Sequence, residues 1–557
     1  MSQKIVIIGG VAGGASAAVR VRRLDESAQV ILLERGSYIS FANCGLPYYI
    51  GDAIKKRNNL LVQTPKAMKA RFNIDVRIDS EAMKIDTKAK TVEVKNHATG
   101  ETYTESYDKL ILSPGASPVV PPIPGLNECN VFTVWSIPDT DRIKEYVTAR
   151  QLKSAVVVGG GFVGIEMVEN LHVLGLEVTV VEMLDQVMNN VDKDMAQFVH
   201  MELTANGVSL FLSEKVTAFH KDGDQTVVEL GSGKSLATDL VIMAAGIKPN
   251  SELARAAGLA LGERGHIVTS EYLQTSDPDV YAVGDAIEVE DFVAHTRTAV
   301  PLAGPANKQG RIAADNVCGL KSKYLGTQGT SVARVFGKTV ASTGLTEKAL
   351  LRAGKKPYED FLVLYSHPFN HATYYPGSTQ IHMKLIFAPG DGRILGAQAV
   401  GMDGTDKRID VIATCIRYGG VASDLARLEL AYAPPYNTAK DPVNFLGFMA
   451  ENVLAGKMDI IQWHELENLD TSKYQLVDVR TAKENEEGAI PGSLLVPVDD
   501  IRANLDKFDK SKTALVYCRV GLRAYIATRI LGQNGIKARN VTGGWLTWEA
   551  GTFKPNK

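Results

Sequence analysis

Two copies of one glycine-rich pattern constrain the fold of this chain more than any other feature of its sequence. The first copy, "KIVIIGGVAGGASAAVRVRRL", begins at residue 4, and the second, "SAVVVGGGFVGIEMVENLHVLGLEVTVVEM", begins at residue 154. In each copy a fully apolar run, of the kind buried in parallel sheets, leads into a glycine turn and then a helical pattern. Two such openings predict two nucleotide-binding α/β domains in one chain.

The second copy carries the complete G-x-G-x-x-G spacing at Gly159, Gly161 and Gly164. The first glycine permits a tight turn, the second lets a pyrophosphate approach the backbone, and the third lets the helix pack closely on the strand. Glu182 ends the next strand, where a carboxylate accepts hydrogen bonds from a ribose 2′-hydroxyl and repels a 2′-phosphate. We therefore predict an NADH site and expect NADPH to bind less well.

The first copy departs from this spacing, because Val11 stands at the middle position between Gly9 and Gly14. Glu34, at the end of the following strand, still favours a nucleotide site. Two later segments, "LILSPGASP" and "TSDPDVYAVGDA", resemble the domain crossing and the second flavin motif of flavoproteins that contain two dinucleotide-binding domains. The resemblance implies FAD on the first domain, with Asp285 binding its ribityl chain.

This resemblance extends to about residue 445 and implies which residues contact FAD and NADH. Most of them lie in the glycine turns or directly after predicted strands, where nucleotides bind in folds of this type. The implied cofactor-binding residues are Gly9, Gly10, Ala12, Gly13, Gly14, Glu34, Arg35, Ser113, Gly115, Gly159, Gly161, Phe162, Val163, Gly164, Glu182, Gly246, Gly284, Asp285, Pro301, Leu302 and Ala303.

Length, charge and cysteine use exclude several classes of protein. At 557 residues the chain is too long for one hydrophobic core, and its net charge of -2 gives no broad basic surface for nucleic acid. No apolar run approaches the roughly 18 residues of a membrane span, and "MSQKIVIIGG" enters a strand instead of forming a signal peptide. Five widely spaced cysteines do not resemble a secreted disulfide scaffold. We expect a cytoplasmic protein with no nucleic-acid and no membrane partner.

The single Cys44 in "SYISFANCGLPYYIG" reduces the number of flavoprotein classes that this chain can resemble. Glutathione-reductase-like flavoproteins carry two cysteines five positions apart in the first helix after the flavin turn, whereas the next cysteine here is Cys129. "SFANCG" instead resembles the branch with one cysteine, which contains coenzyme A disulfide reductases, NADH oxidases and NADH peroxidases. In that branch the cysteine cycles through a mixed disulfide or a sulfenic acid. The oxidases and peroxidases carry a histidine in the flavin turn, where this chain has Ala12.

The flavin turn "GGVAGGASAA" resembles the coenzyme A branch. In that branch two tyrosines of an interface domain reach the thiol chemistry of the partner subunit. The matching residues are Tyr374 in "HATYYPG" and Tyr432 in "AYAPPY", with Tyr375 and Tyr436 as neighbouring alternatives. An active site that takes tyrosines from a neighbouring subunit implies a homodimer.

A coenzyme A ligand is a polyanion and requires cations. Arg20 and Arg23 share one face of the first predicted helix, although arginines in this arrangement fit a solvated helix face equally well. The resemblance implies a substrate-binding set of Ser16, Arg20, Arg23, Ser40, Asn43, Arg71, Asn307 and Lys440.

A second kind of cysteine site lies near the C-terminus. "CRVGLR", from Cys518 to Arg523, follows the predicted strand "TALVY" and matches the six-residue C-x-x-G-x-R loop of rhodaneses. A strand–loop–helix arrangement points backbone amides and the helix dipole at the sulfur, which stabilises a thiolate or a persulfide anion. "LVDVR" and "VTGGW" resemble further rhodanese segments. The resemblance implies that Cys518 carries sulfane sulfur, with Arg523 in the same catalytic loop.

The expected fold is α/β, with two Rossmann-like dinucleotide-binding domains, an α+β dimerisation domain and a C-terminal α/β rhodanese domain. Cys129, Cys318 and Cys415 lack metal-ligand spacing, and the ten histidines form no cluster in the sequence, so no metal site is predicted. The predicted domains are FAD-binding at 1–118 and 246–324, NADH-binding at 119–245, dimerisation at 325–445, a linker at 446–460 and rhodanese at 461–557.

These features predict an enzyme that reduces S–S bonds. The chain resembles fused coenzyme A disulfide reductase–rhodanese proteins, also described as NADH-dependent persulfide reductases. The resemblance implies that Cys518 supplies sulfane sulfur and that Cys44 breaks an S–S bond of a small thiol, persulfide or disulfide substrate with electrons from NADH. Three alternatives remain: an NADH oxidase or peroxidase, a coenzyme A disulfide reductase with an inactive rhodanese domain, and a redox-sensing sulfur-carrier scaffold.

Overall fold

The computed structural model describes residues 2–555 and divides into two compact units. The first unit comprises residues 1–183 and 214–327, and the second comprises residues 184–213 and 328–557. Residues 184–213, which the sequence places inside the NADH-binding domain, therefore belong to the second unit. Within residues 2–555 the structure has no helix long and apolar enough to cross a membrane.

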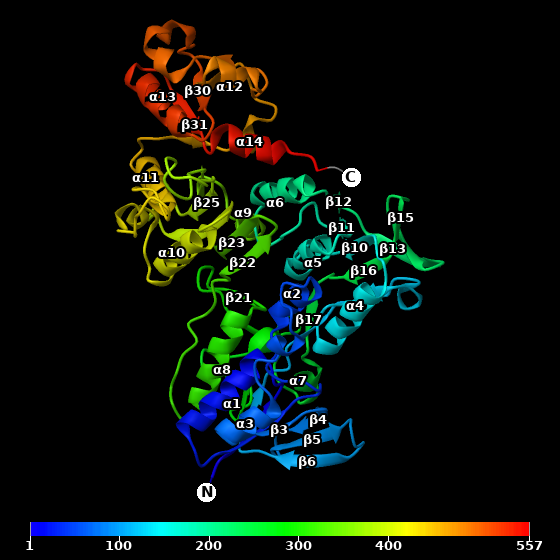
Figure 1. Cartoon of the computed structure of the whole chain (residues 1–557). Helices are drawn as coiled ribbons and strands as arrows, with labels where there is room; N and C mark the ends of the chain where they lie inside the picture. The colour runs from blue at the N-terminus through cyan, green and yellow to red at the C-terminus, as the bar shows by residue number, and fades with distance from the viewer. Residues whose placement is uncertain (1, 556–557) are drawn as a thin grey trace. The chain divides into compact units, whose positions relative to one another are not determined.

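A five-stranded parallel sheet with the order β19-β7-β1-β2-β3 forms the core of the first nucleotide-binding fold. Figure 1 shows helices α1 and α8 side by side in this fold. Ile5, Val6 and Ile7 in the central strand are fully buried, which explains why that strand is apolar on both faces. Helix α1 packs on β1 and β2 and against α8. The bounds are β1 (Lys4–Ile8), α1 (Ala12–Leu24), β2 (Gln29–Leu33), β3 (Asp75–Arg77), β7 (Lys109–Leu112), β19 (Val280–Ala282) and α8 (Ala303–Val317).

The second nucleotide-binding fold repeats this arrangement, with parallel strands in the order β11-β10-β16-β9 and helix α5 after the glycine turn. The chain crosses between the two folds through β8 and returns through β17, and these two strands pair antiparallel. The bounds are β8 (Ala116–Pro118), β9 (Val131–Phe132), α4 (Ile137–Ala149), β10 (Ser154–Val158), α5 (Phe162–Val173), β11 (Glu177–Glu182), β16 (Leu240–Met243) and β17 (Ile247–Pro249).

An antiparallel sheet with the order β22-β23-β26-β25-β24 dominates the first part of the second unit. Strand β24 is therefore an edge strand, and helix α6 packs on this sheet. Helix α11 runs through the first half of the predicted linker. The bounds are α6 (Lys193–Ala205), β22 (Ser331–Val335), β23 (Lys338–Gly344), α9 (Glu347–Arg352), β24 (Leu362–Ser366), β25 (His382–Phe387), β26 (Ile394–Gly401), α10 (Thr405–Arg417) and α11 (Pro442–Leu454).

A parallel sheet with the order β27-β31-β30-β28-β29 forms the C-terminal part of the second unit. This sheet and its helices form the predicted C-terminal α/β domain. The structure therefore confirms the predicted fold class. The bounds are β27 (Ile460–Ile461), β28 (Tyr474–Asp478), α12 (Ala482–Glu486), β29 (Leu494–Leu495), β30 (Thr513–Tyr517), α13 (Leu522–Gln533), β31 (Ala538–Val541) and α14 (Gly544–Thr552).

Arg22 in helix α1 has a structural role. Its side chain is 5% exposed, and its guanidinium donates hydrogen bonds only to backbone carbonyls among the contacts found in residues 2–555. A buried guanidinium is stable only when its donors are satisfied, so this side chain ties the end of α1 to the loop after it and to the end of α3 (Pro65–Phe72). The acceptors are the carbonyl oxygens of Asp25, Glu26, Ala28, Phe72 and Asn73.

Replacing Arg22 by Ala is expected to destabilise the first unit by about 3 kcal/mol, because the carbonyls lose their charged donor. Arg23→Ala is the matched control, since it removes the same charge from an exposed side chain over the Phe72 ring and is expected to cost less than about 1 kcal/mol. Thermal unfolding followed by circular dichroism compares the two variants. Equal midpoints would contradict the structural role of Arg22.

Candidate active sites

The first glycine turn is shaped to bring a ligand close to the backbone. A Cβ atom on Gly14 would lie 1.9 Å from the carbonyl oxygen of Gly9, so α1 can approach β1 only with glycine at this position. Glu34 accepts hydrogen bonds of 2.8 Å from the backbone N–H groups of Gly10 and Gly36. Burial raises the pKa of this carboxyl group. The turn, the helix start and the carboxylate fit the adenosine part of FAD.

The second glycine turn has the same construction. A Cβ atom on Gly164 would lie 2.0 Å from the carbonyl oxygen of Gly159, and the backbone N–H of Gly160 donates a 2.6 Å hydrogen bond to Glu182. A Cβ atom on Gly161 would meet no atom within 4 Å, so the space beside this residue is open for a pyrophosphate. In both folds the acid at the end of the second strand also binds the backbone of the glycine turn, a contact that the spacing of the motif does not reveal.

The sequence-predicted cofactor residues gather at the carboxyl ends of the parallel strands. Ligands of doubly wound folds bind at this edge, because the helix N-termini and the strand-end loops meet there. Some of the predicted residues follow or end a strand: β1 (Gly9, Gly10), β2 (Glu34, Arg35), β7 (Ser113, Gly115), β10 (Gly159, Gly161), β11 (Glu182), β16 (Gly246) and β19 (Gly284, Asp285). The others begin or directly precede a helix: α1 (Ala12, Gly13, Gly14), α5 (Phe162, Val163, Gly164) and α8 (Pro301, Leu302, Ala303).

Cys44 lies in a short 3-10 turn, η1 (Asn43–Gly45), which leads into helix α2 (Leu46–Ile50). The residue is exposed, yet partial desolvation raises the pKa of its thiol, and the carboxylates of Glu166 and Asp285 raise it further. Burial alone raises the pKa of Asp285. The side-chain oxygen of Asn43 is buried without a hydrogen-bond partner among residues 2–555. This orphaned acceptor beside the thiol is consistent with a ligand-binding position.

Glu166 on helix α5 is a member of this site that sequence reasoning missed. Tyr48 on α2 donates a 3.4 Å hydrogen bond to its carboxylate, and burial raises the pKa of Glu166 to about 7. A carboxyl group with a pKa near neutral beside a thiol is suited to exchanging protons. Glu166 stands two residues after Gly164 in the first turns of the nucleotide-binding helix, and this position in the sequence could have indicated a role in the site.

The predicted coenzyme A residues of the first unit fall into two groups. Ser16 donates a 2.5 Å hydrogen bond to Asn307, which brings two predicted residues together from helices far apart in the sequence. Arg20 forms a 2.6 Å ion pair with Asp315, so its charge is partly neutralised and less available to a polyanion than the sequence suggests. The exposed members of the set are Arg23, Arg71 and Asn307, and the half-buried members are Ser16, Arg20, Ser40 and Asn43.

Tyr374 and Tyr432 lie close together in the second unit. Their hydroxyl oxygens are 2.7 Å apart, and the residues are 75% and 48% exposed. The hydrogen bond to Tyr432 raises the pKa of Tyr374. Tyr375, Tyr436 and Lys440 are also exposed in this region. The pair therefore presents two hydrogen-bonded phenols to solvent.

Cys518 lies in a buried turn between β30 and α13. The residue is fully buried, and the backbone N–H of Gly521 donates a 3.1 Å hydrogen bond to its sulfur. Arg523 does not stand free in the loop, because its guanidinium binds both oxygens of Glu484 at 2.7 and 2.6 Å. This contact is the largest of the interactions that lower the pKa of Glu484 to about 2. The amide and the nearby cation suit a thiolate or a persulfide.

Among residues 2–555 the structure has no group of three or more His, Cys, Asp or Glu side chains that could hold a metal ion. Cys44, Cys129, Cys318, Cys415 and Cys518 are all free thiols.

The nucleotide-binding part of the chain matches the family described as pyridine nucleotide-disulphide oxidoreductase over residues 3–310. Residues 332–442 match the dimerisation domain of that family, and residues 464–551 match the rhodanese-like domain. The chain therefore belongs to the pyridine nucleotide-disulphide oxidoreductases, a family that implies FAD and NAD(P)H as cofactors, and it carries a rhodanese-like domain in addition.

Two solved structures are similar over almost the whole chain. The reduced CoADR-RHD of Bacillus anthracis is 50% identical, with a TM-score of 0.96 over 99% of this chain and 98% of that chain. A NAD-dependent persulfide reductase from A. fulgidus is 36% identical, with a TM-score of 0.90 over 98% of this chain and 100% of that chain. The coenzyme A disulfide reductase of Staphylococcus haemolyticus is 34% identical over 452 residues, which cover 81% of this chain and 100% of that relative.

Replacing Glu166 by Gln is expected to lower the pKa of the Cys44 thiol, because the variant lacks the carboxylate whose negative charge opposes thiolate formation. At pH 8 Glu166 is ionised in the wild type, so the variant should be alkylated at Cys44 about two- to threefold faster. Iodoacetamide labelling of the reduced enzyme, read from the Cys44 peptide by mass spectrometry, measures the rate. Glu169→Gln, on the same helix, is the control; equal acceleration in both variants would refute a local effect.

Proposed function

We propose that the chain is an FAD-dependent, NADH-driven reductase of coenzyme A persulfide and coenzyme A disulfide, with redox-active Cys44 and with sulfur transfer through Cys518. The observation that carries this proposal is the presence of two differently built thiol sites in one chain. Cys44 is exposed beside a nucleotide-binding edge and carboxylates, and Cys518 is buried with an amide on its sulfur. The names of the relatives from Bacillus anthracis and A. fulgidus support the same combination.

The proposed chemistry at Cys44 is a thiol–disulfide exchange followed by reduction. The Cys44 thiolate attacks the outer sulfur of coenzyme A persulfide, forming a new S–S bond while coenzyme A leaves as its thiolate. FAD, held by the first glycine turn with Glu34 and Asp285, would supply two electrons that originate from NADH. Reduction of the S–S bond on Cys44 by two electrons would regenerate the thiolate and release hydrosulfide. With coenzyme A disulfide the same exchange leaves a mixed disulfide on Cys44 and releases a second coenzyme A thiol.

Protons for the leaving thiolate have two proposed sources. The phenols of Tyr374 and Tyr432 form one hydrogen-bonded pair, so either hydroxyl can pass its proton to a sulfur while the other stabilises the phenolate. In the first unit, Glu166 titrates near neutral pH and exchanges protons with the site of Cys44. Ser16, Asn307 and the exposed cations of the substrate-binding set are proposed to hold the coenzyme A itself.

Preference for NADH over NADPH is proposed from Glu182. Its carboxylate accepts a 2.6 Å hydrogen bond from the backbone N–H of Gly160, which fixes the carboxylate at the second glycine turn. A fixed negative charge accepts hydrogen bonds from a 2′-hydroxyl and repels a 2′-phosphate.

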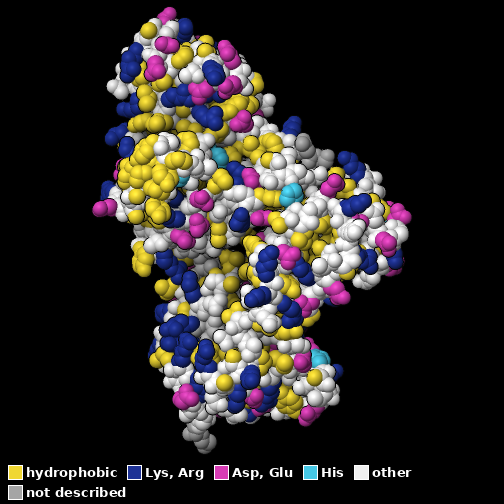
Figure 2. Space-filling model, in the orientation of Figure 1, with side chains coloured by type: hydrophobic (Ala, Val, Ile, Leu, Met, Phe, Trp, Pro, Cys, Tyr) yellow, Lys and Arg dark blue, Asp and Glu magenta, His cyan; other side chains and the backbone are white. Residues whose placement is uncertain are grey.

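A homodimer is proposed from the surface of the dimerisation domain. Figure 2 shows hydrophobic side chains gathered on one face of the second unit, over the region around α11. Exposed apolar patches of this kind mark interfaces. The exposed aromatic residues of this domain are Phe369, Tyr374, Tyr375, Tyr418, Tyr432, Tyr436 and Phe448.

Replacing Cys44 by Ser should abolish turnover of coenzyme A persulfide and coenzyme A disulfide, a loss of at least about a thousandfold, because no thiolate remains to form the new S–S bond. Bleaching of the flavin by NADH should persist, since the nucleotide turns are unchanged. Stopped-flow absorbance separates the two steps. Turnover at the wild-type rate would refute the scheme.

Replacing Cys518 by Ser should spare NADH-driven reduction of free coenzyme A persulfide and should abolish sulfur transfer from thiosulfate. The reason is that the two thiols perform separate reactions. Both rates are measured on the full-length holoenzyme, with the thiocyanate assay for sulfur transfer. Loss of both activities together would contradict independent roles.

The NADH oxidase and peroxidase alternative is tested by the choice of electron acceptor. NADH consumption is measured with coenzyme A persulfide, coenzyme A disulfide, peroxide and oxygen offered separately. Fast oxidation with oxygen or peroxide alone would replace the proposed function. Slow turnover with every acceptor, together with a protein trapped on Cys518 through a disulfide, would favour the sulfur-carrier scaffold.

A further inference from the structure

The loop that carries Cys518 is closed from one side by the start of helix α14. The backbone N–H of Trp545 donates a 2.8 Å hydrogen bond to the carbonyl oxygen of Cys518, and the N–H of Leu546 donates a 3.1 Å bond to that of Arg519. Gly544 has a φ of +59°, and a Cβ atom on it would lie 2.2 Å from the Cys518 carbonyl oxygen. The first turn of α14 therefore fixes the backbone of the sulfur-bearing residue.

The same helix start is attached to the edge strand of the antiparallel sheet. The backbone N–H of Tyr365 in β24 donates a 2.9 Å hydrogen bond to the hydroxyl of Thr542. One residue further on, a Cβ atom on Gly543 would lie 2.6 Å from the Cβ of Tyr365, so the two segments are in close contact. The His367 ring contacts the hydroxyl of Thr547 through Nε2 at 2.7 Å.

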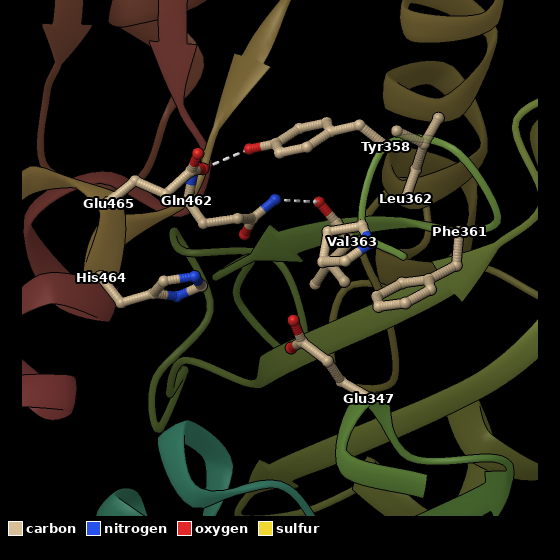
Figure 3. A pocket seen from close by; sticks show the side chains of 9 residues that line it. Glu347, Tyr358, Phe361, Leu362, Val363, Gln462, His464 and Glu465 are labelled. Atoms are coloured by element: carbon tan, nitrogen blue, oxygen red, sulfur yellow. Dashed lines mark hydrogen bonds between the residues drawn. The ribbon is translucent and has the colours of Figure 1, made fainter. Parts of the chain in front are cut away.

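The hydrogen bond from Tyr365 uses a backbone group that an edge strand leaves unpaired. In β24, Val363 and Tyr365 lie two residues apart, so their outward groups share one edge. Figure 3 shows the second contact of that edge, where the side-chain amide of Gln462 donates a 3.0 Å hydrogen bond to the Val363 carbonyl oxygen, with Tyr358 donating to Glu465 beside it. The rhodanese-like domain thus caps the edge of the dimerisation sheet.

Tyr365 is itself held from the other side by a buried ionic cluster. Its hydroxyl donates to Asp194 on α6, and Lys384, which is fully buried, lies 2.9 Å from that carboxylate, 3.1 Å from Asp192 and 2.7 Å from Glu347. A buried charge with three carboxylate partners has little freedom to move. The cluster therefore fixes the position of Tyr365.

His367 is held in a similar way. Its Nδ1 lies 2.9 Å from Nδ1 of His382, whose ring stacks on Phe198 with 3.8 Å between the ring centroids. The two rings meet because His367 directly follows β24 and His382 begins the adjacent strand β25. Burial lowers the pKa of His367 to about 3, so the ring is neutral and binds Thr547 as a polar partner without charge.

We propose that His367 and the backbone of Tyr365 are positioning residues for sulfur transfer at Cys518, acting through Thr547 and Thr542 on the segment that closes the Cys518 loop. This inference rests on the proposed role of Cys518 in sulfur transfer. The dimerisation domain then contributes to the sulfur-transfer site without touching the sulfur. Its edge strand sets the first turn of α14, which in turn sets the carbonyl of Cys518 and leaves the Gly521 amide directed at the sulfur.

The test varies Thr547 and Thr542 because removing the fully buried ring of His367 would open a cavity. Thr547→Val and Thr542→Val keep the side-chain shape and remove the hydroxyl. Each should lower kcat for thiosulfate-dependent sulfur transfer about five- to tenfold. A rate change of this size corresponds to the free energy of one hydrogen bond. The KM for thiosulfate should be unchanged. Thr547→Ser and Thr542→Ser restore the hydroxyl and should restore the rate.

Two further readouts separate positioning from general damage in the full-length holoenzyme. NADH-driven reduction of coenzyme A disulfide should stay at the wild-type rate in every variant. Thr552→Val, which removes an exposed hydroxyl from the end of the same helix, should leave sulfur transfer unchanged. The alkylation rate of Cys518, read by mass spectrometry, should change in the two Val variants and recover in the Ser variants.

Wild-type sulfur transfer and wild-type Cys518 reactivity in both Val variants would overturn the proposal. Equal loss of sulfur transfer and of disulfide reduction would also overturn it, because the effect would then be general. If the wild-type chain transfers no sulfur, the proposed function of Cys518 fails. In that case the alkylation rates of Cys518 still decide whether the edge strand positions the loop.

Discussion

The hydrogen bonds from the glycine turns to Glu34 and Glu182 are the contacts on which the rest of the first unit depends. Each carboxylate ends a parallel strand and holds the turn that follows the neighbouring strand, at 2.8 Å in one fold and 2.6 Å in the other. Because the turn is fixed, the helix after it starts at a defined point with its free amides directed at the sheet edge. That edge collects the predicted cofactor residues and Cys44.

Much of this arrangement could be predicted from the sequence, because it is set by local patterns. Apolar runs bounded by glycine define β1 and β10, and the strand–loop–helix around "CRVGLR" matches β30 and α13. The fold class and the family follow from these motifs. The roles assigned to single residues, such as Tyr374 and Lys440, rest on resemblance and stay predictions.

Other features could not be predicted, because they depend on contacts between distant segments. Arg22 looks like one more cation of a basic helix face, yet it binds only backbone carbonyls among the described contacts. Arg20 forms an ion pair with Asp315, almost three hundred residues away, and the carboxylate offsets its positive charge. Burial in the folded protein, together with the nearby carboxylate of Glu169, raises the pKa of Glu166 to about 7. The sequence shows the residue types, and tertiary burial decides what they do.

The capped edge of β24 determines what would happen if the C-terminal domain were removed from this chain. A strand edge with an unpaired N–H at Tyr365 and an unpaired carbonyl at Val363 is a template for pairing with another chain. In this protein Thr542 and Gln462 occupy those groups. Removing the C-terminal domain would therefore expose an edge strand with unpaired backbone groups, so this domain also protects the dimerisation sheet against self-association.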